Sequence, residues 1–216
     1  MKIETVVDEK GLRIIRLELS SWATNAYIVI CPETMKSILV DVPPGAPTLV
    51  KALKGTDLQL ILLTHSHIDH YAGLPAFRAR LNVPYAVHPK DNQPWLPSPP
   101  DILVRNGAVF RAGKVRLEAI YTPGHTPGST CYRVADYLLA GDTVFPGGPG
   151  RTVSPAGFRS ILRSFEKKVL PLPDDMKAFP GHGDATVLGK EKREFTAFLA
   201  RPHDPRLHGD VVWLTS

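Results

Sequence analysis

The sequence predicts an α+β fold in which two mixed β-sheets pack face to face and helices cover their outer faces. Three observations support this prediction. Segments rich in β-branched and aromatic residues, typical of strands, occur in both halves of the chain. Amphipathic segments typical of helices lie between and after them, and 21 prolines divide the chain into many short elements. Strands that dominate both halves favour two packed sheets over one doubly wound sheet.

Composition indicates an ordinary globular protein with a sizeable core, because 43% of the 216 residues are hydrophobic and 22% are charged. No repeat or low-complexity linker divides the chain, so we expect a single domain over residues 1–216, with 201–216 as a C-terminal tail. The net charge of +5 comes from scattered residues. This mild bias suits a small acidic substrate and is too weak to indicate nucleic acid.

Neither a membrane span nor a secretory signal is predicted, so we expect a cytoplasmic protein without a membrane partner. The only two cysteines, Cys31 and Cys131, lie in apolar strand-like segments. They exclude a disulfide scaffold and are expected to be buried thiols.

The first half of the chain is predicted to be mainly strands. Residues 58–63 (LQLILL) form a fully apolar run with the length of a buried strand, and Leu74 and Phe77 recur at helical spacing. In chain order we expect strands 3–7, 13–19, 25–31 and 37–42, helix 46–54, strand 58–63 and helix 71–80.

The second half of the chain is predicted to contain both strands and helices. Residues 158–170 place apolar side chains such as Phe158, Ile161 and Phe165 on one helical face, and Pro171 ends that pattern. In chain order we expect strands 85–87, 109–111, 115–121, 130–134 and 137–140, helix 158–170, strand 177–179 and helix 190–200.

The segment THSHIDH, from Thr64 to His70, follows directly after the predicted strand 58–63. It contains three of the eight histidines and one carboxylate, ligands that suit zinc, iron or manganese. In an extended stretch His65 and His67 point the same way and can reach one metal ion. As the chain turns into the next helix, Asp69 and His70 are redirected and can reach a second.

Three further residues each follow a predicted strand beside glycine: His125 in TPGHTPG, Asp142 in AGDT and His182 in FPGHG. Glycine lets the backbone approach a site closely. Taken singly these residues are weak signals, since an aspartate after a strand commonly forms a turn or caps a helix. Together with the first motif they provide three ligands for each of two metals, and a carboxylate to bridge them.

The motifs THSHIDH, TPGHTPGS, AGDTVF and FPGHG, in this order, resemble the metallo-β-lactamase superfamily over nearly the whole chain. The resemblance implies that superfamily's αβ/βα sandwich. It also implies that Asp41 hydrogen-bonds a ligand, although a simple turn before Pro43 is an equal interpretation. The implied ligands are His65, His67 and His125 for the first metal and Asp69, His70 and His182 for the second, with Asp142 bridging the two.

Such a centre predicts hydrolytic chemistry. Two divalent ions about 3.5–4 Å apart hold a hydroxide between them and lower the pKa of its parent water toward neutrality. The hydroxide attacks a carbonyl, and one metal stabilises the oxyanion that develops. We expect Asp69 to act in catalysis by orienting the hydroxide. Two zinc ions are the expected cofactor, with iron or manganese as alternatives.

Within the superfamily the chain is most similar to short glyoxalase II-like hydrolases (hydroxyacylglutathione hydrolases). The similarity lies in GDTVF, in Pro149-Gly150-Arg151 and in LPLPDD before PGHG. It implies hydrolysis of a small-molecule thioester, such as a glutathione thioester. Two departures leave other esters and lactones open: full-length members have a helical C-terminal domain that forms much of the thiol pocket, and Val153 replaces a glutathione-contacting tyrosine.

Two alternatives remain from the same superfamily. A persulfide (sulfur) dioxygenase would use one iron on His65, His125 and Asp142, and GRT at 150–152 resembles its loop. A lactonase or another ester hydrolase is the second alternative; lactonases carry a tyrosine where this chain has Phe145. A metal-binding domain without catalysis is a third hypothesis. Trp95 is expected to line the substrate entrance, because long irregular loops such as 89–100 often form pocket walls. Arg151 and Phe145 are expected to contact substrate because the resemblance places them where relatives carry a glutathione-contacting basic residue and the lactonase tyrosine.

Overall fold

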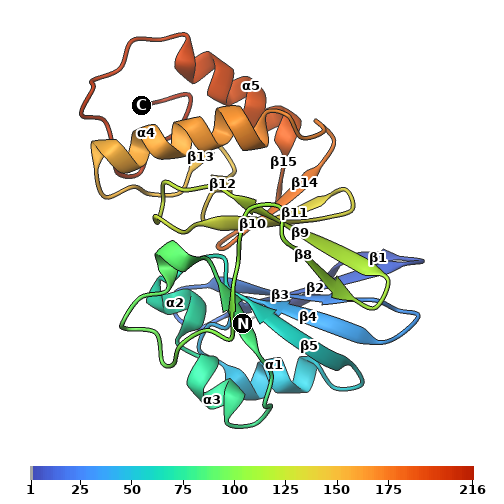
Figure 1. Ribbon diagram of the computed structural model, residues 1–216. Helices are drawn as coiled ribbons and strands as arrows, with labels where there is room; N and C mark the ends of the chain where they lie inside the picture. Colours follow the sequence, from blue (N-terminus) through green and yellow to red (C-terminus); the bar gives the residue numbers. More distant parts are fainter. Residues whose placement is uncertain (1) are drawn as a thin grey trace.

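The computed structural model describes residues 2–216, in which two β-sheets lie face to face between two layers of helices (Figure 1). One sheet follows the chain order from β1 to β7, and the other has the order β15-β14-β11-β10-β9-β8. Each sheet contains both antiparallel and parallel pairs. The predicted two-sheet α+β architecture is therefore confirmed.

The first sheet is built from the N-terminal half of the chain. Strands β1 to β4 are joined by tight turns and pair antiparallel, whereas β4 to β7 pair parallel because helices connect them. Its strands are β1 (Lys2–Glu9), β2 (Leu12–Leu19), β3 (Thr24–Ile30), β4 (Lys36–Val40), β5 (Asp57–Leu62), β6 (Tyr85–Val87) and β7 (Ile102–Leu103). The helical segments of this half are α1 (Ala46–Ala52), α2 (Ile68–Tyr71), α3 (Leu74–Arg78) and the 3₁₀ turn η1 (Pro89–Asp91).

The second sheet comes from the C-terminal half. Strands β11 and β14 pair parallel, and the crossover between them carries helix α4. The strands are β8 (Val109–Ala112), β9 (Val115–Tyr121), β10 (Thr130–Val134), β11 (Tyr137–Gly141), β14 (Lys177–Pro180) and β15 (Thr186–Val187), with β12 (Val144–Phe145) and β13 (Gly148–Pro149) as a separate pair. The helices are α4 (Pro155–Ser164), the π-helical turn η2 (Phe165–Val169) and α5 (Leu188–Leu199).

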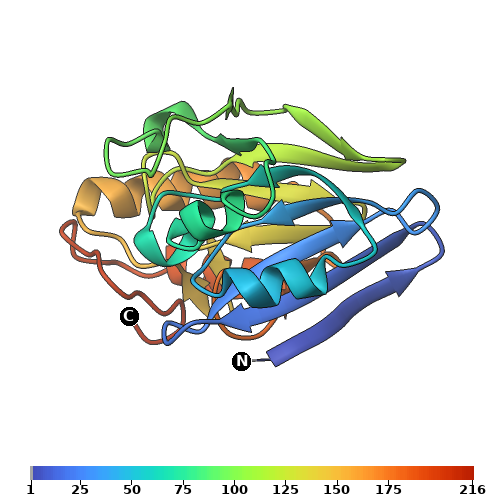
Figure 2. The same cartoon turned by 90° about the horizontal axis from the view of Figure 1, so that it is seen from below.

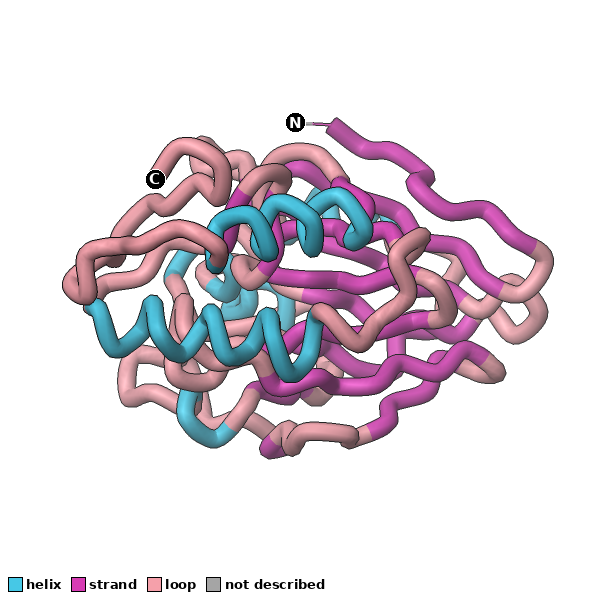
Figure 3. The backbone as a smooth tube through the Cα atoms, turned by 90° about the horizontal axis from the view of Figure 1, so that it is seen from above, coloured by secondary structure: helices cyan, strands magenta, loops and turns pink. Residues whose placement is uncertain are grey.

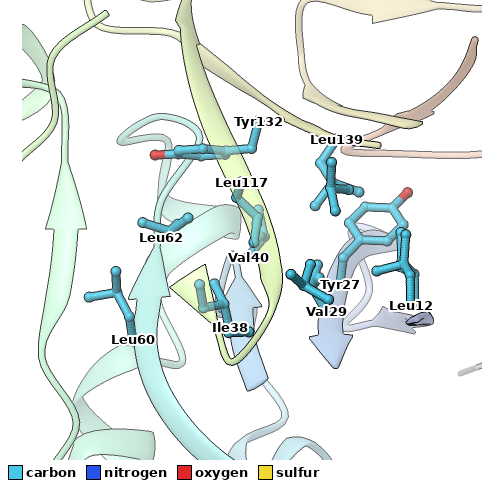
Figure 4. Packing of buried hydrophobic residues seen from close by; sticks show 14 of the residues in the cluster. Leu12, Tyr27, Val29, Ile38, Val40, Leu60, Leu62, Leu117, Tyr132 and Leu139 are labelled. Carbon is cyan, nitrogen blue, oxygen red and sulfur yellow. The ribbon is translucent and has the colours of Figure 1, made fainter. Parts of the chain in front are cut away.

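The main core lies between the sheets (Figure 4). Side chains such as Ile38 and Val40 of the first sheet meet Leu117 and Leu139 of the second. The Tyr132 hydroxyl crosses this layer and donates a hydrogen bond to the Leu63 carbonyl at 2.9 Å. This buried bond ties the end of β5 to the second sheet.

Helices cover the outer faces of the sandwich, as Figures 2 and 3 show from below and from above. Helices α1 and α3 cover the first sheet, while α4 and α5 cover the second. The tail 201–216 packs on this outer layer. Its Trp213 is fully buried among Phe165, Phe195 and Phe198, with ring centroids 5.1–5.2 Å away.

Two predicted helices were wrong in detail. The predicted helix 71–80 is broken at Gly73, whose amide donates to the Val42 carbonyl and where a Cβ would lie 2.2 Å from the Pro43 oxygen. The predicted helix 158–170 starts earlier, at Pro155, because the Ser154 hydroxyl caps it by accepting from the Gly157 amide. It ends in the π-helical turn η2.

The two ends of the sandwich differ. Hairpin turns such as β1–β2 and β8–β9 gather at one end, at the right in Figure 1. The carboxyl ends of β5, β9, β11 and β14 all meet at the other end, and the segments that follow them carry the predicted ligands. Cys31 and Cys131 are buried free thiols, as predicted. Between residues 2 and 216, no helix has the length and apolar character needed to cross a bilayer.

Candidate metal centre

The seven side chains predicted as ligands come together at the carboxyl ends of four strands. The segment after β5 supplies four of them, and the segments after β9, β11 and β14 supply one each. Every one of the seven belongs to at least one cluster of three donors whose ligand atoms lie within 4.8 Å of one another. The clusters are His65–His67–His125, His65–His70–Asp142 and Asp69–His70–His182. Their role as metal ligands stays a prediction.

The first donor group consists of His65, His67 and His125. Its rings lie edge to face, with centroids 4.5–4.8 Å apart. Hydrogen bonds from Nδ1 orient two of the rings: His65 donates to the Thr64 hydroxyl at 3.0 Å and His125 to the Arg151 carbonyl at 2.7 Å. Each of these rings therefore carries its lone pair on Nε2, the nitrogen that faces the other donors.

The second donor group consists of Asp69, His70 and His182, and it is held by internal ion pairs. Oδ2 of Asp69 lies 3.0 Å from Nε2 of His182 and 3.4 Å from Nε2 of His70. The Thr24 hydroxyl also donates to Asp69 Oδ2 at 3.1 Å, and His182 Nδ1 donates to the Trp22 carbonyl at 3.0 Å. The loop between β2 and β3 thus orients this group from the side.

Asp142 lies between the two groups, as expected of a bridging carboxylate. One oxygen, Oδ1, is 3.5 Å from Nε2 of His70. The other, Oδ2, is 3.4 Å from Nε2 of His125 and 3.7 Å from Nε2 of His182. This single carboxylate faces histidines of both groups, so a change here affects both.

Asp41 makes the hydrogen bond to a candidate ligand that the resemblance implied. Its Oδ2 accepts from His70 Nδ1 and from the Thr64 hydroxyl, each at 2.8 Å, and its Oδ1 accepts from the Thr64 amide. Because Thr64 in turn accepts from His65, the one buried carboxylate orients His70 directly and His65 through Thr64. The interpretation of Asp41 as a simple turn residue was wrong.

The pKa values of the histidines shift in opposite directions in the two donor groups. Burial, reinforced by neighbouring histidines, lowers the pKa of His65 well below its usual value, and burial and His125 lower the pKa of His67. Burial acts in the same direction on His70, but the Asp41 and Asp142 carboxylates outweigh it and raise the pKa of His70 to about 9. For His182 the Asp69 carboxylate likewise outweighs burial, and the pKa is raised.

Three buried donor atoms of the centre have no hydrogen-bond partner among residues 2–216: Nε2 of His65, Nε2 of His125 and Oδ1 of Asp142. A buried polar atom left unpaired costs about 1–3 kcal/mol. All three carry lone pairs and converge on the same centre, and imidazole and carboxylate donors suit a divalent transition metal. The residues present therefore fit a metal ion.

Sequence reasoning missed Asp91, a fully buried carboxylate in η1. Its Oδ2 accepts from the Ser66 amide at 2.9 Å and from the Thr126 hydroxyl at 2.7 Å, and its Oδ1 accepts from the Gly128 amide at 2.7 Å. Asp91 thus joins the segment of His65 and His67 to that of His125. The available signal was an aspartate in HPKD after a buried strand, a pattern also typical of surface loops.

Gly181 shows why glycine accompanies the ligands. A Cβ at this position would lie 2.1 Å from Oδ1 of Asp142 and 2.6 Å from Cε1 of His70. Any side chain here would therefore displace both donors. The Gly181 backbone also pairs with the sheet, accepting from the Asn25 amide and donating to the Gly141 carbonyl.

The three residues predicted to contact substrate differ in their exposure and in their position relative to the donor groups. Trp95 is 60% exposed, and its Nε1 donates to the Ser66 carbonyl at 3.3 Å, beside the first donor group. Arg151 is also exposed and is joined to that group through its carbonyl, which accepts from His125. Phe145, in β12, is half-buried three residues after Asp142. Their contact with substrate stays a prediction.

Comparisons with known proteins agree with this geometry. The family model described as "Metallo-beta-lactamase superfamily" matches residues 20–182. The probable metallo-hydrolase YqgX of Bacillus subtilis is 31% identical over 194 residues, covering 79% of this chain and 90% of the relative. The hydroxyacylglutathione hydrolase of Polaromonas sp. is 33% identical over 171 residues, covering 74% of this chain but 64% of the relative. Hydroxyacylglutathione hydrolase GloC of Haemophilus influenzae is 29% identical over 187 residues (76% and 88%).

Solved structures show the same fold. The crystal structure of the BLEG-1 B3 metallo-beta-lactamase has a TM-score of 0.77 and 29% identity, and the match covers 83% of this chain and 96% of that one. TTHA1623 in a di-iron-bound form has a TM-score of 0.70 and 27% identity, with coverages of 82% and 96%. ETHE1 from Myxococcus xanthus, at 22% identity and a TM-score of 0.72, covers 94% of this chain and 86% of that chain.

Proposed function

The chain belongs to the metallo-beta-lactamase superfamily of metallo-hydrolases, and from this premise we propose that it hydrolyses thioesters with the help of two divalent metal ions. One observation carries the metal part of the proposal. Three buried donor atoms, on His65, His125 and Asp142, converge without a partner among the described residues. The related protein TTHA1623, in its di-iron-bound form, supports a count of two ions.

We assign the first metal to His65, His67 and His125 and the second to Asp69, His70 and His182, with Asp142 facing both. Divalent ions held there would lower the pKa of a bound water and polarise the substrate carbonyl. The protein's own part is orientation: Asp41 fixes His70, and the Arg151 carbonyl fixes His125. Asp69 is the proposed catalytic carboxylate, since Thr24 and His182 hold it beside the centre, where it can orient the attacking water.

Support for a thioester substrate comes from relatives. Two of those described above are named hydroxyacylglutathione hydrolases, and sequence segments around Asp142 and Arg151 resemble that group. Zinc is the proposed metal, although histidine and aspartate ligands also accept iron and manganese.

Metal content and hydrolysis together test the proposal. We expect elemental analysis to give close to two metal ions per chain, and the loaded protein to hydrolyse S-lactoylglutathione or a simpler acyl thioester. Asp142→Ala should lower metal content and reduce kcat/KM by more than about 100-fold, exceeding the loss typical of a residue that only orients a ligand.

Two results would overturn the proposal. One iron per chain with oxygen uptake on glutathione persulfide, and no hydrolysis, would identify a dioxygenase instead. Two metals with hydrolysis of lactones or oxygen esters alone would keep the metal centre and remove the thioester. Asp136→Ala, at an exposed aspartate between β10 and β11, is the matched control and should leave both metal content and hydrolysis unchanged.

A further inference from the structure

Large apolar side chains are exposed on segments that border the metal centre. Trp22 is 50% exposed and Ile68 58%. The Trp22 carbonyl accepts from His182, and Ile68 lies in the sequence between His67 and Asp69. Both exposed side chains therefore belong to residues that flank the second donor group, one in the loop before β3 and one at the start of α2.

Two more lie beside the first donor group. Trp95, 60% exposed, donates from Nε1 to the Ser66 carbonyl, while its own carbonyl accepts from the Tyr71 hydroxyl at 3.3 Å. Val153, 78% exposed, follows the Arg151–Thr152 segment whose carbonyl orients His125. We call these four side chains the apolar rim: Trp22, Ile68, Trp95 and Val153.

The rim differs from the other exposed apolar side chains by its place beside the donor groups, since Ile102 and Leu103 are also exposed next to each other but lie on the edge strand β7. Val109 and Val187, for example, lie singly on strands β8 and β15, and isolated exposed apolar residues are normal. Four large apolar side chains on four segments around one reactive centre are not scattered. Apolar surface gathered around a few polar groups is typical of a ligand site.

Two arginines on segments that contact the donor groups are already paired with carboxylates. Arg151 lies 3.4 Å from Asp210 of the tail. Arg16, which donates to the Gly183 carbonyl next to His182, also pairs with Glu4 and Asp184. A polyanionic substrate would have to compete with these carboxylates, whereas an apolar group needs only the rim.

We propose that the substrate is a thioester with an apolar arm of several carbons, which the rim covers while the carbonyl reaches the donor groups. This inference rests on the proposed function and specifies its substrate class. The arm can belong to the acyl side or to the thiol side of the thioester. Burying an arm of this kind stabilises the complex in proportion to the apolar area that it removes from water.

Two substrate series test the inference on the metal-loaded protein: acyl chains of two to eight carbons on N-acetylcysteamine, and acetyl thioesters of alkyl thiols of the same lengths. In at least one series kcat/KM should rise roughly fourfold per methylene, since each buried methylene contributes ~0.8 kcal/mol. The series that rises identifies the side that carries the arm. A flat profile in both series would overturn the inference while leaving thioester hydrolysis intact.

Substitutions in the apolar rim test which side chains produce the gain in kcat/KM per methylene. Trp22→Ala and Trp95→Ala should reduce the gain per methylene to less than about twofold, whereas Trp95→Phe should retain most of it, because the ring and not its Nε1 covers the arm. Val153→Ala has a matched control in Val187→Ala, an exposed valine on β15. The first should flatten the profile and the second should not. Equal slopes in all variants would contradict the rim.

Binding provides a readout that does not depend on turnover. Straight-chain carboxylates from acetate to octanoate and alkyl thiols of the same lengths are the hydrolysis products of the two series, and at least one of the two sets should bind the metal-loaded protein with affinity that rises with length. Two of the three tryptophans belong to the rim and the third, Trp213, is buried, so tryptophan fluorescence can follow this binding. If no thioester is cleaved, the proposed function fails, and the length dependence of carboxylate and thiol binding still decides for or against the rim.

Discussion

The two donor groups of the metal centre differ in what surrounds them. In the first group, Nε2 of His65 and Nε2 of His125 are buried without a partner among the described residues, and the pKa of His65 is lowered by burial. In the second group, His70 and His182 already face carboxylates, which raise the pKa of both. His65 and His67 lie five and three positions before His70 in one motif, yet their electrostatic surroundings are opposite to its own.

This difference shows how the fold prepares each group. The first group is oriented from outside, by Thr64, by the Arg151 carbonyl and by Asp91, and offers free lone pairs to a cation. The second group is also oriented from outside, by Asp41, Thr24 and the Trp22 carbonyl, but its donors pair with one another as well, and metal binding would exchange those ion pairs for bonds to metal. We therefore expect changes in the first group to act mainly on metal affinity, and changes around the second to act also on assembly of the site.

The largest effect is expected from His65→Ala compared with His182→Ala. His65 belongs to two of the donor clusters and is fully buried, while His182 belongs to one and is partly exposed. Removing His65 should reduce kcat/KM by more than about 100-fold, and removing His182 should cost less. Steady-state kinetics and metal content of both variants measure this. Equal losses would mean that the two groups contribute alike.

Asp41→Asn changes a carboxylate that hydrogen-bonds candidate ligands without being one of them. Asparagine keeps the shape but has one acceptor oxygen for donors that now use both, so His70 loses its orientation directly and His65 only through Thr64. We expect metal affinity to fall about 10- to 100-fold, with the ion assigned to His70 affected most. Competition with a chromophoric chelator measures each binding step. A uniform loss at both steps would contradict this assignment.

Asp91→Asn tests the outside support of the first group. The amide cannot accept from all three donors, on Ser66, Thr126 and Gly128. A buried donor left unpaired should lower the free energy of unfolding by about 1–3 kcal/mol. Urea denaturation checks the stability and kinetics check the activity, with the exposed Asp136→Asn as control. Full activity with unchanged stability would show that Asp91 supports nothing.

The smallest effect on the centre is expected from Trp213→Ala. This tail side chain packs among phenylalanines of the outer helical layer and touches neither donor group. The free energy of unfolding should fall by about 3–5 kcal/mol, while kcat/KM of the folded protein stays within about twofold. Trp213→Phe serves where the alanine variant does not fold. Loss of activity at full stability would place the tail in the site.

Much of the fold could be predicted because its signals are local. The apolar run before Thr64 and the β-branched strands of both halves are long enough to show their periodicity, and strands β6, β9 and β10 match the predicted bounds. Two-residue strands such as β7 and β12 carry no periodicity, and pairing with neighbours creates them. The break at Gly73 likewise depends on a contact with Val42, which no local pattern contains.

The residues of the metal centre likewise fall into those that the sequence predicts and those that it does not. The seven predicted ligands stand in short motifs after strands, and the structure brings all of them together. Asp91 and Trp22 were missed because their importance comes from partners far along the chain: Asp91 contacts Gly128, and the Trp22 carbonyl contacts His182. A loop residue gives no sign in its own neighbourhood of which distant segment it will meet.

The donors after β5 and β14 come from different sheets, so one ion bound by His70 and His182 would cross-link positions 112 residues apart (182 − 70). In the chain-entropy description of disulfides, closing a loop of that length restricts the unfolded chain by about 4–5 kcal/mol. As long as the ion stays bound while the chain opens, it acts as a staple between the two halves. Unlike a disulfide, this cross-link would form and break with metal supply and not with redox conditions.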